Sequence, residues 1–336
     1  MNRHDRPSDA PQPPEASAVA PRIAVLVPCY NEELTIGTVV DDFRRALPEA
    51  DIYVYDNNSS DRTSEIAREH GAIVRFEPRQ GKGVTVRQMF RDIEADCYVL
   101  VDGDDTYPAE AARALIEPIL RGEADMAVGD RLTNGTYEHE NTRAFHAFGN
   151  NLVRWLIHWI YGYSFHDVMT GYRAFSRLFV KTMPVLSVGF QIECEMSIQA
   201  VDKHWRILEI PIAYRDRPAG SFSKLSTVSD GIRVLVAIGS LFKDYRPLKF
   251  FTLAALLFAA CGLVAGVPVI LEYLATAYVS RVPSAILAAA LMFCAALSLS
   301  TGAILDTVAK GERKRWELAV YEVQERAKRR ENGRAR

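Results

Sequence analysis

The sequence is short of cysteine and has no cysteine pattern. Its five cysteines are scattered over 336 residues, none belongs to a CxxC pair, and two of them fall within long apolar runs. Such spacing excludes a disulfide framework of the kind that staples small secreted domains. We therefore predict that the cysteines are reduced packing residues in a chain that faces the cytosol.

The N-terminus lacks the apolar core of a signal peptide. Residues 1–21 are polar and rich in proline and alanine, which predicts a disordered lead-in that does not export the chain. The formal charge of the whole chain is only -2, but the last 27 residues hold ten Lys/Arg against five Glu. This basic tail, residues 306–336, favours an anionic surface, and we expect no nucleic-acid partner.

Charge is missing from two long runs, residues 250–271 and 282–305. At about 1.5 Å per residue, each run is long enough as a helix to cross a hydrocarbon layer of about 30 Å. A buried helix of a soluble core is the alternative. The ten-residue link between the runs makes them a transmembrane hairpin, and its only basic residue is Arg281. Because the basic residues lie on the outer flanks, we expect both termini in the cytoplasm and the chain in the inner membrane. Those flanking residues are Arg246, Lys249, Lys310, Arg313, Lys314 and Arg315.

Residues 226–249, just before the first apolar run, have apolar side chains at helical spacing with basic residues among them. This pattern predicts an amphipathic helix that lies in the membrane interface, and a core helix of the soluble domain is the alternative. The apolar positions are Val228, Ile232, Leu235, Ile238 and Phe242.

From Arg22 to about Pro211 the sequence alternates between buried strand patterns and amphipathic helix patterns. This alternation predicts an α/β fold with a mostly parallel sheet that helices cover on both faces. Ligands of such sheets bind beyond the carboxyl ends of the strands. The polar stretches PCYNE, DNNSSD and DGDD all fall at predicted strand ends.

The stretch DGDD crowds carboxylates after an apolar strand, and such crowding is costly unless a partner neutralises it. Asp102 and Asp104 could hold a hard divalent ion, Mg²⁺ or Mn²⁺, with open positions for the phosphate oxygens of a ligand. A solvated acidic loop is the alternative for this stretch taken alone.

Seven motifs in a fixed order favour the metal site over the solvated loop. They are VPCYNE at 27–32, YDNNSSDRT at 55–63, GKG at 81–83, VDGDDTYP at 101–108, VGDRL at 128–132, TGYR at 170–173 and EIPIAYRDRPAGSFSKL at 209–225. The set resembles glycosyltransferase family 2, of GT-A fold, and within it the polyprenyl-phosphate glycosyltransferases related to dolichyl-phosphate mannose synthase. The resemblance covers residues 22–225, about two thirds of the chain. It implies a GT-A domain there and a homo-oligomer, a tetramer in this subgroup.

The resemblance also implies roles for the residues that match the motifs. Asp102 and Asp104 would hold the metal on the diphosphate of a nucleotide sugar. Asp56 and Asn57 would face base and ribose. The family often has an acid at the position of Asn57. An amide there suits the N–H and C=O edge of uracil, so we expect a UDP-sugar. The other nucleotide contacts would be Pro28, Tyr30, Glu32 and, less strongly, Lys82.

The implied reaction is a displacement with inversion at the anomeric carbon by a polyprenyl phosphate. Because that nucleophile is already an anion, the site needs cations more than a strong base. Asp167 matches a common family acid near the reaction centre. The candidates for binding the acceptor phosphate are Arg131, Arg173, Arg217 and Lys224, and solvated surface charge is the alternative for each.

Several residues stay open at this stage. Gln191, Glu193 and Glu195 could form an active-site cluster or the first turn of a helix, where carboxylates are favourable anyway. The aromatic residues between 150 and 173 are expected to pack or to anchor at an interface. His158 and His166 lack ligand spacing and are expected to pack or to form hydrogen bonds.

Three other classes of protein remain. DGDDT also fits the D-x-D-x-T signature of the haloacid-dehalogenase phosphatases, with Asp102 as nucleophile and Asp104 as acid/base, although two strand–helix units precede it here. A processive polysaccharide synthase shares the GT-A motifs, but the sequence lacks its QxxRW motif. A catalytically dead nucleotide-binding scaffold would not need the intact acidic pair.

Overall fold

The computed structural model describes residues 20–133, 144–215, 217–218 and 227–334. Its strands are β1 Ile23–Cys29, β2 Ala50–Asp56, β3 Ile73–Phe76, β4 Cys97–Leu100, β5 Met126–Asp130, β6 Arg173–Ser176 and β7 Ile207–Pro211. Its helices are α1 Ile36–Ala46, α2 Thr63–Glu69, α3 Lys82–Asp92, the short η1 Ala109–Ala111, α4 Ala112–Leu120, α6 Ala144–Tyr161, α7 Arg177–Thr182, α8 Ile192–Asp202, α9 Thr227–Tyr245, α10 Pro247–Thr276 and α11 Val282–Arg334.

One sheet of seven strands organises the α/β part of the described chain, in the order β3-β2-β1-β4-β6-β5-β7. Only β6 runs antiparallel to its neighbours, β4 and β5. The predicted mostly parallel sheet is therefore confirmed. The chain passes from β1 to β2 on one side and reaches β4 on the other, so β1 and β4 flank the point where strand order reverses. A ligand crevice is expected beyond the carboxyl ends of this strand pair.

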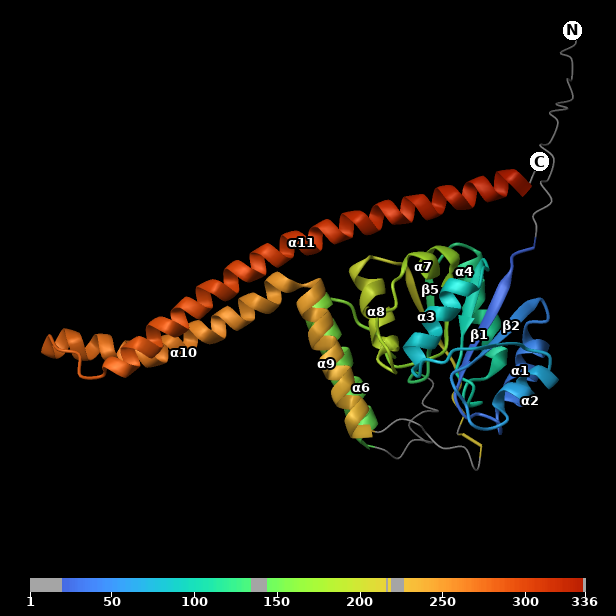
Figure 1. The fold of residues 1–336 in the computed structure, drawn as a ribbon, viewed down its shortest axis with the longest axis horizontal. Helices are drawn as coiled ribbons and strands as arrows, with labels where there is room; N and C mark the ends of the chain where they lie inside the picture. Colours follow the sequence, from blue (N-terminus) through green and yellow to red (C-terminus); the bar gives the residue numbers. More distant parts are fainter. Residues whose placement is uncertain (1–19, 134–143, 216, 219–226, 335–336) are drawn as a thin grey trace, which may run out of the picture.

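Helices cover both faces of the sheet (Figure 1). One buried cluster joins the sheet to α1, α2 and α4, and the other joins it to α3, α6, α7, α8 and α9. β1 and β4 show why the central strands are apolar throughout. Their side chains alternate between the two clusters, so both faces of each strand are buried.

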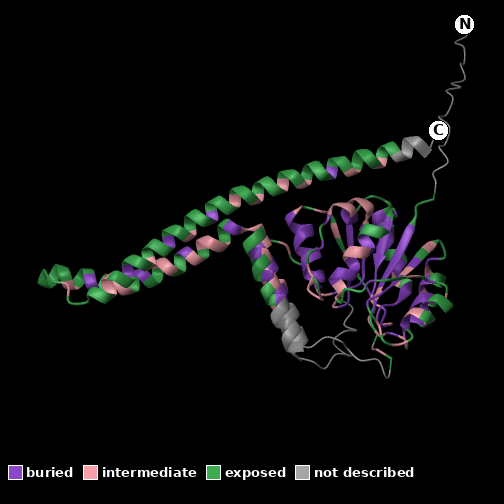
Figure 2. Ribbon diagram, viewed as in Figure 1, coloured by how far each residue is buried: buried purple, intermediate pink, exposed green. Residues whose placement is uncertain are grey.

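Two long helices leave this domain as a hairpin, α10 and α11 (Figure 1). Both are long and apolar enough to cross a membrane. Most of their residues are exposed, as Figure 2 shows, which is not the pattern of a buried soluble helix. α11 also continues past the second apolar run through the basic tail, so the second span and the described part of the tail form one helix.

The amphipathic helix predicted from residues 226–249 is observed as α9. Val234, Ile238 and Phe242 are buried and belong to the core cluster, while Leu235 and Val236 stay exposed. One side of α9 thus packs on the catalytic domain, and α9 also lies along α6 (Figure 1). The packing of the catalytic domain therefore extends beyond residue 225.

Candidate active site

Two turns at the carboxyl edge of the sheet hold each other in place. After β1, Asn31 adopts a left-handed conformation with φ of 52°, and its side chain accepts the N–H of Ser60 at 2.8 Å. The N–H of Glu32 donates to the Thr63 hydroxyl at 2.8 Å. Pro28 is half-buried, Glu32 is buried and Tyr30 is exposed at the edge. These three predicted nucleotide contacts therefore lie together, at the end of β1 and in the turn that follows it.

Asp56 ends β2 and Asn57 follows it, and both are buried. Asp56 accepts hydrogen bonds from the N–H of Ser59 at 2.8 Å and from the hydroxyl of Ser64 at 2.6 Å. The Asn57 amide donates to the carbonyl oxygens of Glu77 and Arg79 and accepts the N–H of Gly81 at 2.7 Å. Both of its N–H groups are already used. The expectation that this amide recognises a base is therefore corrected: Asn57 fixes the loop before α3.

The GKG motif begins α3, and its glycines allow close packing of the backbone. A Cβ at Gly81 or Gly83 would clash with the backbone carbonyl of Val188 or Ser187, respectively. The N–H of Gly83 donates to the Val188 carbonyl at 2.9 Å. This carbonyl occupies the start of the helix, where a P-loop would bind phosphate.

Lys82 is the central cation of the site. Its ammonium nitrogen lies 2.5 Å from Asp102 Oδ1 and 2.6 Å from Glu193 Oε1, and the side chain is only 9% exposed. Burial alone lowers the pKa of Lys82, but the carboxylates of Asp102 and Glu193 outweigh it and raise that pKa. Burial raises the pKa of Glu193, and the Lys82 charge opposes this. Lys82 therefore stays charged and neutralises two acids from different elements.

Asp104 is balanced by a second cation. Its Oδ2 lies 2.5 Å from Arg217 Nη2, and its Oδ1 accepts the Thr106 hydroxyl at 2.6 Å. Burial and the nearby Asp42 carboxylate raise the pKa of the third acid, Asp105. Of the three crowded acids, Asp102 and Asp104 thus each contact a basic side chain.

The structure supports a divalent ion at Asp102 and Asp104 through its donor chemistry. Both residues offer carboxylate oxygens, the donors that Mg²⁺ and Mn²⁺ prefer. Gly171 of the TGYR motif keeps the space open, because a Cβ there would lie 2.5 Å from Asp102 Oδ2 and 3.0 Å from Lys82 Nζ. The residues present therefore fit such an ion.

Arg131 and Asp167, both predicted as site residues, bind each other. The guanidinium donates to the two carboxylate oxygens at 2.6 and 3.0 Å, and both residues are buried. The Arg131 guanidinium also lies 5.4 Å from the centre of the Tyr214 ring and donates weakly to the Tyr107 hydroxyl at 3.4 Å. This bidentate geometry makes Asp167 the residue that orients Arg131.

Two acids that the sequence analysis did not single out hold this pair in place. Glu209 accepts the N–H groups of His166 and Asp167, at 2.7 and 3.3 Å. Asp130 accepts the N–H groups of the two residues that follow Arg131, at 2.8 and 3.2 Å. The sequence signal for them was the position of Asp130 within VGDRL and of Glu209 at the start of the last motif.

Arg173 does not fit the expected contact with an acceptor phosphate. Its side chain is fully buried and donates to the carbonyls of Thr170 and Val168 and to the Ser197 hydroxyl, at 3.0, 2.7 and 2.9 Å. Arg173 therefore holds the backbone of the TGYR turn in place. We replace the expected phosphate-binding role of Arg173 with this positioning role. The other candidate, Lys224, lies outside the described residues.

Glu193 and Glu195 begin α8, so both readings of this acidic stretch hold in part. Glu193 binds Lys82 in the site, whereas Glu195 accepts the N–H groups of Leu186 and Ser187 at 3.0 and 2.8 Å. The sequence could not separate the two roles, since both acids occupy the first turn of one helix.

Comparison with known proteins assigns the chain to a family. The model of glycosyl transferase family 2 matches residues 24–181. Glycosyltransferase AglJ of Haloferax volcanii is 31% identical over 290 residues, which are 85% of this chain and 93% of AglJ. The chain belongs to glycosyl transferase family 2. It is a glycosyltransferase, and the resemblance predicted from the motifs is confirmed.

Two further proteins resemble this glycosyltransferase. A dolichyl-phosphate hexose transferase of Haloferax volcanii is 33% identical over 212 residues, 63% of this chain and 90% of that protein. The fold is similar to glucosyl-3-phosphoglycerate synthase from Mycobacterium tuberculosis, whose crystal structure contains Mn²⁺, UDP and glucosyl-3-phosphoglycerate. That match has a TM-score of 0.52 at 21% identity and covers 65% of this chain and 80% of that one. The predicted GT-A fold class is thereby confirmed.

Proposed function

We propose that this glycosyltransferase moves a sugar from a nucleotide diphosphate sugar to a polyprenyl phosphate at the membrane surface. The observation that carries the proposal is the placement of Arg217. It contacts Asp104 in the site and lies on the segment that leads to α9 and the apolar hairpin. The site and the membrane part thus meet in one stretch of chain, and the similarity to a dolichyl-phosphate hexose transferase supports this acceptor class.

In the proposed reaction, a phosphate oxygen of the acceptor attacks the anomeric carbon while the bond from that carbon to the diphosphate breaks, with inversion. No proton has to leave the nucleophile. Arg131, oriented by Asp167, and Arg217 bring the anionic acceptor to the anionic donor. Lys82 keeps Asp102 in position. A divalent ion held by Asp102 and Asp104 would neutralise charge on the departing nucleoside diphosphate.

We assign the donor side to Pro28 in β1, to Tyr30 and Glu32 in the turn that follows, and to Asp56. Asn57 no longer favours uracil, because its amide is committed to the backbone. A UDP-sugar remains our prediction, together with undecaprenyl phosphate as the acceptor. The positive flanks of the hairpin support our proposal that both termini lie in the cytoplasm. A homo-oligomer also remains a prediction, which native mass spectrometry can check.

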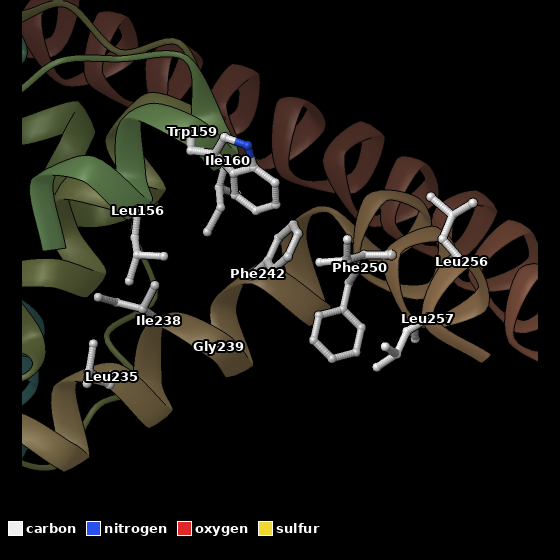
Figure 3. A pocket seen from close by; sticks show the side chains of 12 residues that line it. Leu156, Trp159, Ile160, Leu235, Ile238, Gly239, Phe242, Phe250, Leu256 and Leu257 are labelled. Atoms are coloured by element: carbon white, nitrogen blue, oxygen red, sulfur yellow. The ribbon is translucent and has the colours of Figure 1, made fainter. Parts of the chain in front are cut away.

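An apolar groove between α6, α9 and α10 supports contact with hydrocarbon (Figure 3). Its volume is about 710 Å³. Trp155 and Trp159 on α6 stack at 6.3 Å and are both more than half exposed. Exposed tryptophans beside a candidate span are typical of a membrane interface. Side chains that line the groove include Leu156, Trp159, Ile238, Phe242, Phe250 and Leu257.

The phosphatase alternative has no support in this fold. Its signature aspartate ends the first strand of its sheet, whereas Asp102 follows β4 and binds Lys82. A processive synthase shares the family, but two candidate spans in the described residues are few for a translocation pore.

The proposal is tested by incubating membranes that contain the protein with radiolabelled nucleotide sugars and undecaprenyl phosphate, followed by lipid extraction. We expect label in the lipid phase with one sugar nucleotide, and no label with Asp104→Asn membranes. Release of free phosphate without labelled lipid, or label in a long water-soluble polymer, would contradict the proposal.

A further inference from the structure

Far from the strand ends, a buried carboxylate joins the catalytic domain to both helices of the hairpin. Asp202, the last residue of α8, has a side chain only 1% exposed. It lies 3.0 Å from Arg313 on α11 and 3.4 Å from Arg246, the N-cap of α10. Arg313 also donates to the Tyr245 carbonyl at the end of α9, at 2.9 Å. Asp202 and its two arginines therefore connect α8, α9, α10 and α11.

This carboxylate is in an unfavourable place by itself. A negative charge at the C-terminus of a helix opposes the helix dipole, and burial adds a desolvation cost. Among the described residues, no group donates a hydrogen bond to its Oδ2. Two arginines form ion pairs with this carboxylate: Arg246 at the start of α10 and Arg313 on α11, so both come from the part of the chain that carries the hairpin. Asp202 is thus poor for local stability and well placed for joining two parts of the molecule.

Aromatic contacts complete the same junction. The Trp316 indole of α11 donates to the Thr182 carbonyl at 3.2 Å and packs edge-on against Trp205 at 5.5 Å. Lys203, next to Asp202, lies 5.2 Å from the centre of the Trp316 ring. α11 is therefore fixed on the catalytic domain by two neighbouring contacts, one ionic and one aromatic.

The helix that carries Asp202 also reaches the active site. All eleven residues of α8 are buried, and its first turn carries Glu193, which binds Lys82. A helix of this length spans about 16 Å and is stiff. A tilt of the hairpin at one end of α8 would therefore be transmitted to the acidic site at the other.

We propose that Asp202 is a positioning residue that, through Arg246 and Arg313, locks the membrane hairpin to the catalytic domain and sets the site at the height of a membrane-borne acceptor. The inference rests on the proposed function for its kinetic consequence. The lock itself is independent of that function, so the two can fail separately.

The kinetic test compares two acceptors in the full-length protein. Asp202→Asn and Arg313→Gln are assayed with undecaprenyl phosphate in vesicles and with short, water-soluble geranyl phosphate. We expect kcat/KM for the long lipid to fall about ten- to a hundredfold, and that for the short acceptor to stay within about twofold. The matched control is Arg315→Gln, which removes an exposed pair with Glu312 on the same helix and should change neither value. Equal losses with both acceptors, or none, would overturn the inference.

A second measurement needs no activity. Hydrogen exchange of residues 306–329 is followed by mass spectrometry in nanodiscs, with UDP and GDP binding as a check that each variant is folded. We expect faster exchange in Asp202→Asn and in Arg313→Gln than in the wild type and Arg315→Gln. If the wild type transfers no sugar to either acceptor, the proposed function fails, and exchange alone decides. Unchanged exchange in both Asp202→Asn and Arg313→Gln would then overturn the inference.

Discussion

At the scale of single residues, three acids of the site each contact a basic side chain. Lys82 neutralises Asp102 and Glu193, and Arg217 neutralises Asp104. Buried or half-buried carboxylates are costly without such partners. The pairing also means that replacing one side chain changes the charge felt by its partner, which sets the design of the variants below.

Asp104→Asn should reduce sugar transfer by about a hundredfold or more, since it removes a charged oxygen from the proposed metal site. Excess Mn²⁺ should restore part of the rate. Asp105→Asn is the matched control: it makes the same change in the same loop, and asparagine tolerates the φ of 58° at this position. Full transfer by Asp104→Asn in the presence of a chelator would refute the metal assignment.

Arg217→Gln should lower kcat/KM for the lipid phosphate by about ten- to a hundredfold, which corresponds to a charge-assisted contact of about 1.5 to 3 kcal/mol. Nucleotide affinity, measured by calorimetry with UDP and GDP, should change little. Arg215→Gln serves as the control, because Arg215 pairs with Glu110 at the surface. A variant that loses nucleotide affinity but keeps its lipid kinetics would move Arg217 to the donor side.

Asn57→Asp tests whether this residue holds a loop or recognises a base. The aspartate can still accept the N–H of Gly81, but it cannot donate to the carbonyls of Glu77 and Arg79. We expect the free energy of unfolding to fall by about 1 to 3 kcal/mol. The preference among sugar nucleotides should not change. A switch from UDP- to GDP-sugars with unchanged stability would restore the base-recognition role.

At the scale of elements, two motif glycines keep space open against different neighbours. Gly83 at the start of α3 faces the backbone carbonyl of Ser187, which cannot move without shifting the loop. Gly171 faces the ends of two flexible side chains, Asp102 and Lys82. The first glycine therefore concerns packing of the chain, and the second concerns the geometry of the site.

Replacement by alanine is thus expected to affect stability at Gly83 and metal dependence at Gly171. Gly83→Ala should lower the melting temperature by several degrees, because an overpacked backbone contact costs about 1 to 3 kcal/mol. Gly171→Ala should leave the melting temperature nearly unchanged but raise the metal concentration needed for half-maximal transfer. Thermal unfolding and metal titration of both variants check this contrast. Loss of stability in Gly171→Ala with normal metal dependence would contradict it.

At the scale of the whole molecule, two features favour contact with a membrane. The hairpin can span it, and α6 and α9 present exposed apolar side chains beside the groove. α9 also contributes Val234, Ile238 and Phe242 to the core. A cut before α9 would therefore expose the core, whereas a cut after Arg246 keeps the Asp202 pair with that residue.

A chain that ends at residue 246 should fold, bind nucleotide and still associate with anionic vesicles through α6 and α9, but carbonate extraction should release it. The full chain should resist extraction. Transfer to undecaprenyl phosphate should fall steeply in the shortened protein. The measurement is vesicle flotation followed by extraction and assay. A shortened chain that resists carbonate would show that the hairpin is not the anchor, and a periplasmic reporter signal at residue 336 would overturn the proposed topology.

The sequence alone determined the elements and the outline of the site. Apolar runs that alternate with amphipathic stretches gave the sheet and its covering helices, and the charge-free runs gave the hairpin. These signals are local and periodic, so they survive without knowledge of the fold. The polar stretches after β1, β2 and β4 converge because the carboxyl ends of parallel strands meet at one edge of a sheet.

The tertiary structure alone decided which charges meet and which amides are free. Nothing in the sequence pairs Lys82 with Glu193, commits the Asn57 amide to the backbone, buries Arg173 beneath the TGYR turn or joins Asp202 to Arg313. Such contacts connect residues far apart in the chain, and their strength depends on burial. The sequence states which side chains are charged, but the partner of each charge and its exposure to water are set only when the chain folds.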